Sequence, residues 1–309
     1  MTTPFPSPSQ GQSQGQWQSQ GGQSPSQGTA RATRLRIRHA TGFAYTEAAA
    51  ASYNEARLTP LTTPDQFVLR SRIDVTPTAW SQEYRDYWGT TVTAFEVHEP
   101  HDSLTVVATS TVEVTPHAVD AEPVGWDALA DVEDEWCEFL ATDDWTRPHD
   151  DLLARLDALR AAASSPGEYA VAVFGLVHDH VRYLPGSTVV DTQAAEAWAS
   201  GAGVCQDIAH VTLGALRHAG VPARYVSGYL HPSPEPVVGE TVEGESHAWI
   251  EYWDGDWRGF DPTNAVVPAE RHVLVARGRD YADSPPLRGI YSAQGESRMV
   301  VSVEITRLR

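Results

Sequence analysis

A glycine-flanked turn that leads into a helix at a cysteine is the feature that most constrains how this chain can fold. Residues 201–203, Gly-Ala-Gly, come just before Cys205, and apolar residues then recur at helical spacing as far as Ala219. Gly220 suits the left-handed position after a helix, and Pro222 prevents its continuation. The sequence therefore predicts a helix whose first residue is Cys205.

A cysteine at a helix start is a candidate nucleophile. Unpaired backbone N–H groups and the positive end of the helix dipole favour a thiolate there, and the same N–H groups can bind an oxyanion. A buried apolar role for Cys205 fits the approaching glycines less well. The second cysteine, Cys137, lies among acidic residues and is predicted to be structural. Two cysteines are too few for a disulfide framework, so a reducing compartment fits best.

An imidazole and a carboxylate follow in a predicted β-hairpin. His247 opens an aromatic strand, residues 254–256 form the turn, and the returning strand leads to Asp261. A three-residue turn places Asp261 diagonal to His247 on one face, whereas a two-residue turn would place it opposite Ala248 on the other face. We predict the three-residue turn. It also pairs large side chains, Ile250 with Phe260 and Trp253 with Trp257.

A thiol, an imidazole and a carboxylate in fitting contexts predict a catalytic triad of Cys205, His247 and Asp261. His210, the nearest histidine, lies five residues further along the helix and about 140° around it, so it is poorly placed as the base. No metal ligand set and no cofactor is predicted. Possible oxyanion donors or supporting residues are Tyr183, Trp198, Gln206, Asp207, Trp249 and Asn264.

Composition narrows the partners and the compartment. The 41 acidic residues outnumber the 22 basic ones, all of them arginine, and the net charge is −19. Nucleic acid and anionic membranes are therefore poor partners, because the overall field repels phosphate. No apolar stretch approaches the roughly 20 residues that span a bilayer, and the first residues lack the pattern of a secretory signal. We expect a soluble, cytoplasmic protein, whose oligomeric state the sequence leaves open.

Four regions follow one another along the chain. Residues 1–32 form a Gln/Ser/Gly/Pro-rich tail of the composition typical of disorder. Apolar residues alternate over residues 33–118, which predicts a small antiparallel β domain, a sandwich. Residues 119–160 are predicted to be a helical acidic connector. Residues 161–309 would form the α+β catalytic core with its C-terminal strands, including a helix over 166–182 and an access loop over 231–245.

Several short motifs resemble the transglutaminase-like superfamily, in particular its bacterial branch with a β-rich amino-terminal region. The resemblance covers about residues 33–309, and Thr90 departs from it where the family expects Asn after Gly. The motifs in the core are Gly203-Val204-Cys205-Gln206-Asp207, Ala223 to Tyr229, Ser246-His247-Ala248-Trp249 and Asp261-Pro262-Thr263-Asn264. Those in the amino-terminal region are His39-Ala40-Thr41 to Tyr45, Tyr84-Arg85-Asp86 and Trp88-Gly89.

The resemblance implies a papain-like α+β core with Cys205 as nucleophile, His247 as general base and Asp261 as the group that orients it. The substrate would be a protein or peptide that carries a carboxamide, and the reaction would pass through a thioester. An amine would resolve the thioester in a transferase, and water would resolve it in a cysteine protease or amidase. A third hypothesis, from a different class, is a non-catalytic binding or scaffold protein.

Overall fold

The computed structural model describes residues 32–117 and 119–309, so the predicted tail over 1–32 lies almost entirely outside the described residues. The strands are β1 (Thr33–Ala49), β2 (Ser52–Ala56), β3 (Gln66–Thr76), β4 (Trp80–Arg85), β5 (Thr91–Val97), β6 (His101–Val114), β7 (Arg182–Tyr183), β8 (Ala202–Gly203), β9 (Ala223–Leu230), β10 (Thr241–Trp253), β11 (Trp257–Phe260), β12 (His272–Gly278), β13 (Leu287–Tyr291) and β14 (Ser297–Arg307). The helices are α1 (Asp150–Ala162), α2 (Pro166–His180), α3 (Ala194–Ser200) and α4 (Cys205–His218), with 3₁₀ turns at Trp126–Leu129, Cys137–Phe139 and Tyr281–Asp283.

The amino-terminal strands form the predicted antiparallel sandwich. One sheet of the sandwich has the order β14-β1-β6-β3 and continues beyond β14 into β10, β9 and β12, and the other sheet has the order β13-β2-β5-β4. Apolar residues of both sheets, among them Phe95 and Leu104, pack between them. The period of two in β6 reflects this packing, because one face of the strand is buried against the second sheet. Leu104, Val106 and Ala108 face the second sheet, and Val112 and Val114 of the same face pack against β9 and β12 instead.

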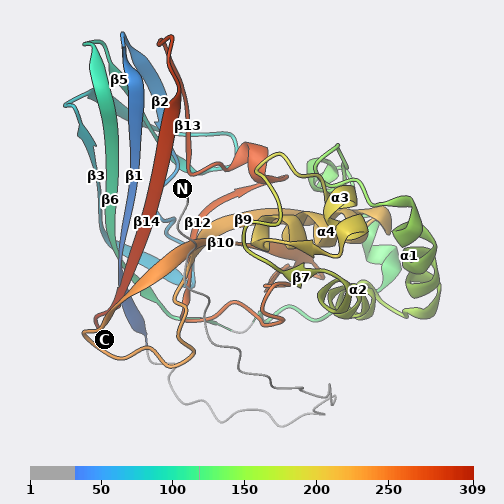
Figure 1. Cartoon of the computed structure of the whole chain (residues 1–309). Coiled ribbons are helices and arrows are strands. Elements are labelled where there is room, and N and C mark those ends of the chain that lie inside the picture. The colour runs from blue at the N-terminus through green and yellow to red at the C-terminus, as the bar shows by residue number, and fades with distance from the viewer. Residues whose placement is uncertain (1–31, 118) are drawn as a thin grey trace. The chain divides into compact units, whose positions relative to one another are not determined.

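The C-terminal strands pair with the amino-terminal region, which differs from the expected division at residue 161. β14 runs antiparallel to β1, with Leu35 opposite Arg307, and β13 runs antiparallel to β2. Alternating apolar residues indicate that a strand exists, but they do not identify a partner more than 250 residues away. The sandwich is therefore closed by both ends of the described chain, as Figure 1 shows for β1 and β14.

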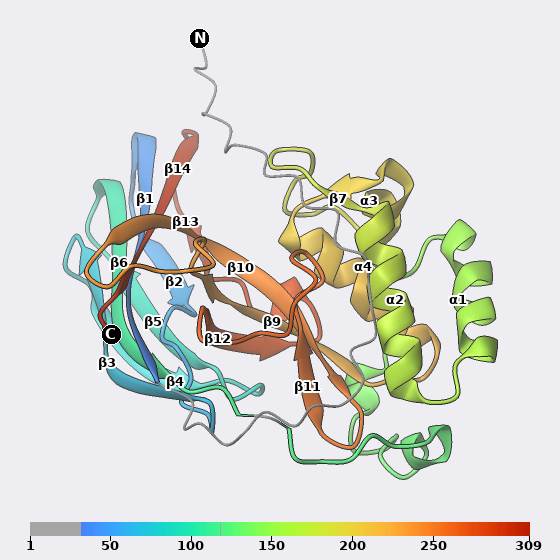
Figure 2. The same ribbon diagram turned by 90° about the horizontal axis from the view of Figure 1, so that it is seen from below.

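The helical layer consists of β9, β10 and β12 with helices packed over β9 and β10 (Figure 2). The predicted stripe of α2, which contains Tyr169, Val173 and Val177, is buried in this core. The expected acidic connector is not a continuous helix. Its described part before α1 holds only short turns, and α1 itself packs into the core through Leu152 and Leu156. Its acidic side chains favour solvent, so only the segment with helically spaced leucines forms an α-helix.

One further expectation is refined by the structure. The access loop after β9 is shorter than predicted, because β10 already begins at Thr241. No helix in the described part of the chain is long and apolar enough to cross a membrane.

Candidate active site

Helix α4 begins at Cys205 as predicted, and a buried carboxylate fixes its first turn. The Asp207 carboxylate accepts hydrogen bonds from the Val204 N–H (2.8 Å) and from the Thr188 hydroxyl (2.6 Å). Burial raises the pKa of Asp207 against these bonds. A Cβ on Gly203 would lie 2.8 Å from the Cβ of Asp207, so this position has no room for a side chain. At the other end, Gly220 adopts the predicted left-handed conformation with φ of 78°.

The β10–β11 hairpin has the predicted register. Ile250 lies opposite Phe260 and Trp253 lies opposite Trp257. Asp261 therefore follows β11 on the face of His247, and the His247 Nε2 lies 2.7 Å from the Asp261 Oδ2. The three-residue turn thus forms the histidine–carboxylate contact on which the predicted site depends.

The Asp261 carboxylate is completely buried and accepts several hydrogen bonds. Its Oδ2 lies 3.1 Å from the His272 Nε2 and 2.8 Å from the Asn264 Nδ2. Its Oδ1 accepts from the backbone N–H groups of Thr263 (3.0 Å) and Asn264 (3.2 Å). Burial opposes ionisation, but these contacts and the His247 charge hold the pKa of Asp261 well below its usual range.

His247 connects this carboxylate to the cysteine. Its Nε2 faces Asp261, which leaves Nδ1 as the ring nitrogen for the Cys205 thiol. Burial disfavours the charged ring, yet the hydrogen bond to Asp261 and the proximity of Cys205 outweigh it and raise the pKa of His247 to about 10. The imidazole therefore holds a proton at neutral pH beside the Cys205 side chain.

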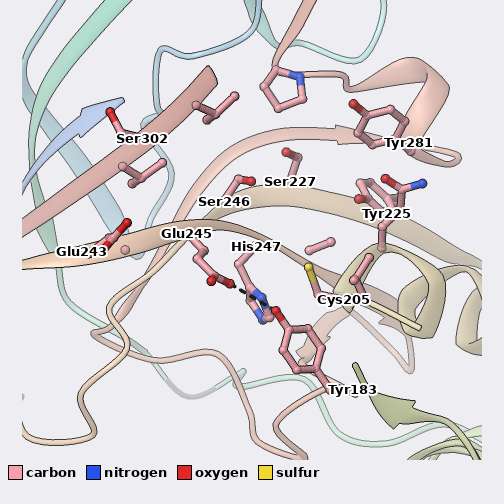
Figure 3. A pocket seen from close by; sticks show the side chains of 17 residues that line it. Tyr183, Cys205, Tyr225, Ser227, Glu243, Glu245, Ser246, His247, Tyr281 and Ser302 are labelled. Carbon is pink, nitrogen blue, oxygen red and sulfur yellow. Dashed lines mark hydrogen bonds between the residues drawn. The ribbon is translucent and has the colours of Figure 1, made fainter. Parts of the chain in front are cut away.

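Cys205 and His247 line one pocket of about 380 Å³ between the helical layer and the sandwich (Figure 3). Tyr183 of β7 also lines it, and its hydroxyl donates a hydrogen bond to Glu245 (3.2 Å). Burial, with the nearby charges of Glu245 and Cys205, raises the pKa of Tyr183, so its O–H stays protonated near the sulfur. Among the pocket's lining residues, Glu243 and Glu245 are acidic and none is arginine. The site can therefore present a nucleophile, a proton carrier and hydroxyl or N–H donors to one carbonyl group.

Two regions of the chain match families of known proteins. Residues 35–113 match the bacterial transglutaminase-like N-terminal region, and residues 154–262 match the transglutaminase-like superfamily. The chain belongs to the transglutaminase-like superfamily. An uncharacterized protein of Mycobacterium leprae is 44% identical over 277 residues, which cover 89% of this chain and 99% of that relative.

Two other similarities are more distant. A protein-glutamine gamma-glutamyltransferase of Pseudomonas aeruginosa is 30% identical over 149 residues, 44% of this chain and 22% of that protein. A crystal structure from Cytophaga hutchinsonii, described as a proposed cysteine protease, has a TM-score of 0.73 at 22% identity and covers 90% of this chain and 92% of that one. This superfamily member is a cysteine-dependent enzyme of the thiol acyltransferase or peptidase type.

The structure separates the supporting residues that the sequence grouped together. Tyr183 and Gln206 line the pocket, but the Gln206 amide already donates to the Val190 carbonyl (2.8 Å). Trp198 stacks on His180 with ring centroids 3.8 Å apart and is not among the pocket's lining residues. Trp249 is buried beside the His247 ring, also outside the lining. Of the predicted donors, Tyr183 and Gln206 are the two that line the pocket, and the Tyr183 hydroxyl also already donates, to Glu245.

His272 is the site residue that the sequence analysis missed. Its Nδ1 accepts from the Ala269 N–H (3.2 Å), which puts the ring proton on Nε2, facing Asp261. Burial lowers the pKa of His272, so it acts as a neutral donor beside a charged His247. In the described residues, His247, Asp261 and His272 are close enough to ligate a metal. The protonated Nε2 of His272 fits hydrogen bonding to the carboxylate rather than coordination.

Proposed function

We propose that this enzyme transfers the acyl group of a carboxamide to an amine through a thioester on Cys205. The substrate is a protein or peptide, and the carboxamide is a glutamine side chain. The observation that carries the proposal is the position of His247 between Asp261 at 2.7 Å and the Cys205 thiol, with its pKa raised to about 10. A protonated His247 beside a thiolate supplies both the nucleophile and the acid that the first step needs.

In the first step, the Cys205 thiolate attacks the carboxamide carbon and forms the C–S bond. The backbone N–H groups at the start of α4 donate to the developing oxyanion, and the Tyr183 hydroxyl turns from Glu245 to donate to it as well. The C–N bond then breaks, and His247 gives its proton to the departing ammonia. In the second step an amine attacks the thioester, His247 accepts the amine proton, and the sulfur leaves as the thiolate. The Asp261 carboxylate keeps the imidazole oriented throughout.

The acidic pocket supports an amine as the acceptor. Glu243 and Glu245 line the space beside Cys205, and a protonated amine is drawn to such carboxylates before it loses its proton to react. The chain contains no lysine, so it offers no lysine side chain of its own as the acceptor amine. Both cysteines are free, and we infer a reducing, cytoplasmic compartment in which the Cys205 thiol persists.

Hydrolysis, as in a cysteine protease or amidase, is the second candidate function. The specific observation in its favour is that Trp198 and Trp249, which could have shielded a thioester, do not line the pocket. Water therefore has access to the same intermediate that an amine would resolve.

One experiment separates the two functions. The full chain is incubated with a glutamine-containing peptide and an excess of a fluorescent primary amine, and both amine incorporation and ammonia release are measured. Incorporation that matches ammonia release supports transfer. Ammonia release with only the free acid as product, even at saturating amine, refutes transfer and supports hydrolysis. The Cys205→Ala variant must show neither product.

A further inference from the structure

Within residues 32–117 and 119–309, half of β14 lacks a second neighbouring strand. β14 pairs with β1 along its whole length, from Ser297 to Arg307, but it pairs with β10 only from Val303 to Thr306. Burial changes at the same place, since residues 297–302 are all exposed and Val303 is buried. Among the described residues, the backbone of 297–302 is bonded to β1 alone.

The open half begins where β10 leaves β14. A Cβ on Gly244 would lie 2.7 Å from the Ile305 Cδ1, so the glycine allows β10 to cross close over β14. From Glu245 onward β10 pairs with β9 instead. Figure 1 shows β10 crossing one end of β14 and continuing toward α4. The two strands therefore form a fork whose open side includes residues 297–302.

The register shows which backbone groups point into the fork. The Leu308 N–H donates to the Arg34 carbonyl, and the Thr46 N–H donates to the Glu296 carbonyl, so even-numbered residues of this ladder bond to β1. In an antiparallel pair the alternate residues direct their N–H and C=O groups away from the partner. The odd-numbered Arg307 agrees, because its carbonyl accepts from the Gly239 N–H instead. The N–H and C=O groups of Met299 and Val301 therefore point away from β1, along the open edge.

This edge leads into the active-site pocket. Val301 and Ser302 line the same pocket as Cys205 and His247 (Figure 3). Their neighbours Met299 and Val300 are 58% and 59% exposed, an unusual exposure for apolar residues on a strand. An exposed strand edge with free donors and acceptors binds an extended chain by strand addition, and side chains of the strand supply selectivity.

We propose that an extended segment of the substrate polypeptide adds to β14 at residues 297–302 as a further antiparallel or parallel strand, next to the pocket that receives its carboxamide. The segment is neutral or basic, because Glu243 and Glu245 line the pocket and the chain carries a net charge of −19. The inference rests on the proposed function for the identity of the bound segment as substrate. In this proposal, the sandwich binds the backbone of the substrate, and the helical layer supplies Cys205 and His247.

Binding without turnover tests the proposal. The Cys205→Ala full chain is titrated with fluorescein-labelled heptapeptides that carry a central glutamine among Thr, Val and Arg residues, and binding is followed by fluorescence anisotropy. The Met299→Pro change removes one outward N–H but no bond to β1, since proline is tolerated where its nitrogen faces away from the ladder. Met299→Ala removes the same side chain and keeps the N–H, so it is the matched control. We expect the dissociation constant to rise at least tenfold in Met299→Pro and less than threefold in Met299→Ala.

Two further measurements keep the test decisive if Met299→Pro misfolds. Peptides N-methylated at alternate residues should lose binding for one alternate set of amides and keep it for the other, because only one edge of an added strand faces β14. Hydrogen exchange of residues 297–302 should slow on peptide addition. Equal effects of the proline and alanine changes, equal effects of both methylation patterns, or no binding by any peptide overturn the proposal.

The failure of this proposal is distinguishable from the failure of the proposed function. Fast alkylation of wild-type Cys205 at neutral pH with no peptide protection at residues 297–302 leaves the chemistry intact and removes the strand addition. Peptide protection in a chain whose thiol is slow to alkylate does the reverse. Protection that rises with protein concentration in the absence of peptide shows that a second copy of this chain occupies the edge, and it also overturns the proposal.

Discussion

The contact between His247 and Asp261 predicts a strong effect of Asp261→Asn on thiol reactivity. The pKa of His247 is about 10, against an ordinary value of 6.5, which corresponds to about 5 kcal/mol in favour of the charged ring. Burial works against this preference, and contacts with Asp261 and Cys205 provide it. Without the carboxylate charge, His247 holds its proton less firmly and the thiolate loses its partner. We expect alkylation of Cys205 at pH 6.5 to slow by 10- to 100-fold, or about 1.4 to 2.8 kcal/mol.

The assay is iodoacetamide labelling at several pH values, read by mass spectrometry for each cysteine. Cys137 is exposed and serves as the reference thiol in the same molecule. In the wild type, the labelling ratio of Cys205 to Cys137 should be highest near pH 6 and fall toward pH 9, where an ordinary thiol also ionises. In Asp261→Asn the ratio at pH 6 should collapse, and turnover should fall by on the order of 10³ to 10⁴.

A matched change distinguishes this effect from general damage to the site. Asp207→Asn also replaces a buried carboxylate near Cys205, but Asp207 contacts the Val204 N–H and the Thr188 hydroxyl rather than His247. It should leave the labelling ratio at pH 6 equal to or above that of the wild type. A ratio in Asp261→Asn that equals the wild-type value would refute the reasoning, since it would mean that the carboxylate does not sustain the charge on His247.

The other predictions concern the oxyanion, the helix turn and a buried ion pair. Tyr183→Phe should lower kcat by about 10²-fold with little change in KM, because the hydroxyl is needed most when the oxyanion forms, and an unchanged kcat contradicts its role. Gly203→Ala should lower the free energy of unfolding by about 1–3 kcal/mol in a urea titration, because its Cβ would lie 2.8 Å from the Asp207 Cβ. Glu251 is buried, and two arginines lower its pKa to about 2 despite that burial. The ionised Glu251 therefore stabilises the fold above its ordinary pKa of 4.5, and this stabilisation is lost as the pH falls toward 2. Glu251→Gln should lower the free energy of unfolding by about 3 kcal/mol at pH 7 and by progressively less below pH 4.5. A decrease that is the same at every pH would argue against the ion pair.

The positions of Cys205, His247 and Asp261 could be predicted from the sequence because each residue has a local signal. Cys205 follows a glycine-rich turn at a helix start, and a helix leaves its first N–H groups free whatever the rest of the fold does. His247 and Asp261 belong to one hairpin, and the number of residues in its turn decides whether they share a face. These are short-range constraints, so the structure brings together the same three residues.

His272 had no such local signal. It begins β12, which reaches Asp261 through its pairing with β9, and the sequence gives no measure of which strands become neighbours. From the sequence alone, a histidine before Val273 and Leu274 is as consistent with the polar start of a buried strand as with a residue of the active site. The same limit applies to Tyr183, whose partner Glu245 lies 62 residues away on β10. Contacts between separate elements depend on how the whole layer packs, and the local pattern of apolar and polar residues does not predict that packing.

The C-terminal strand shows how far that limit reaches. The alternation of Val301, Val303 and Ile305 predicts a strand with one apolar face, yet only Val303 and Ile305 are buried. The difference arises from Gly244, since β10 covers β14 only up to the point where this glycine lets it cross and turn toward β9. One residue on another strand thus decides that Val301 stays exposed beside Cys205. Gly244→Val, which places a branched side chain against Ile305, should separate β10 from β14 and lengthen the open edge, so hydrogen exchange of residues 303–306 should become faster than in the wild type.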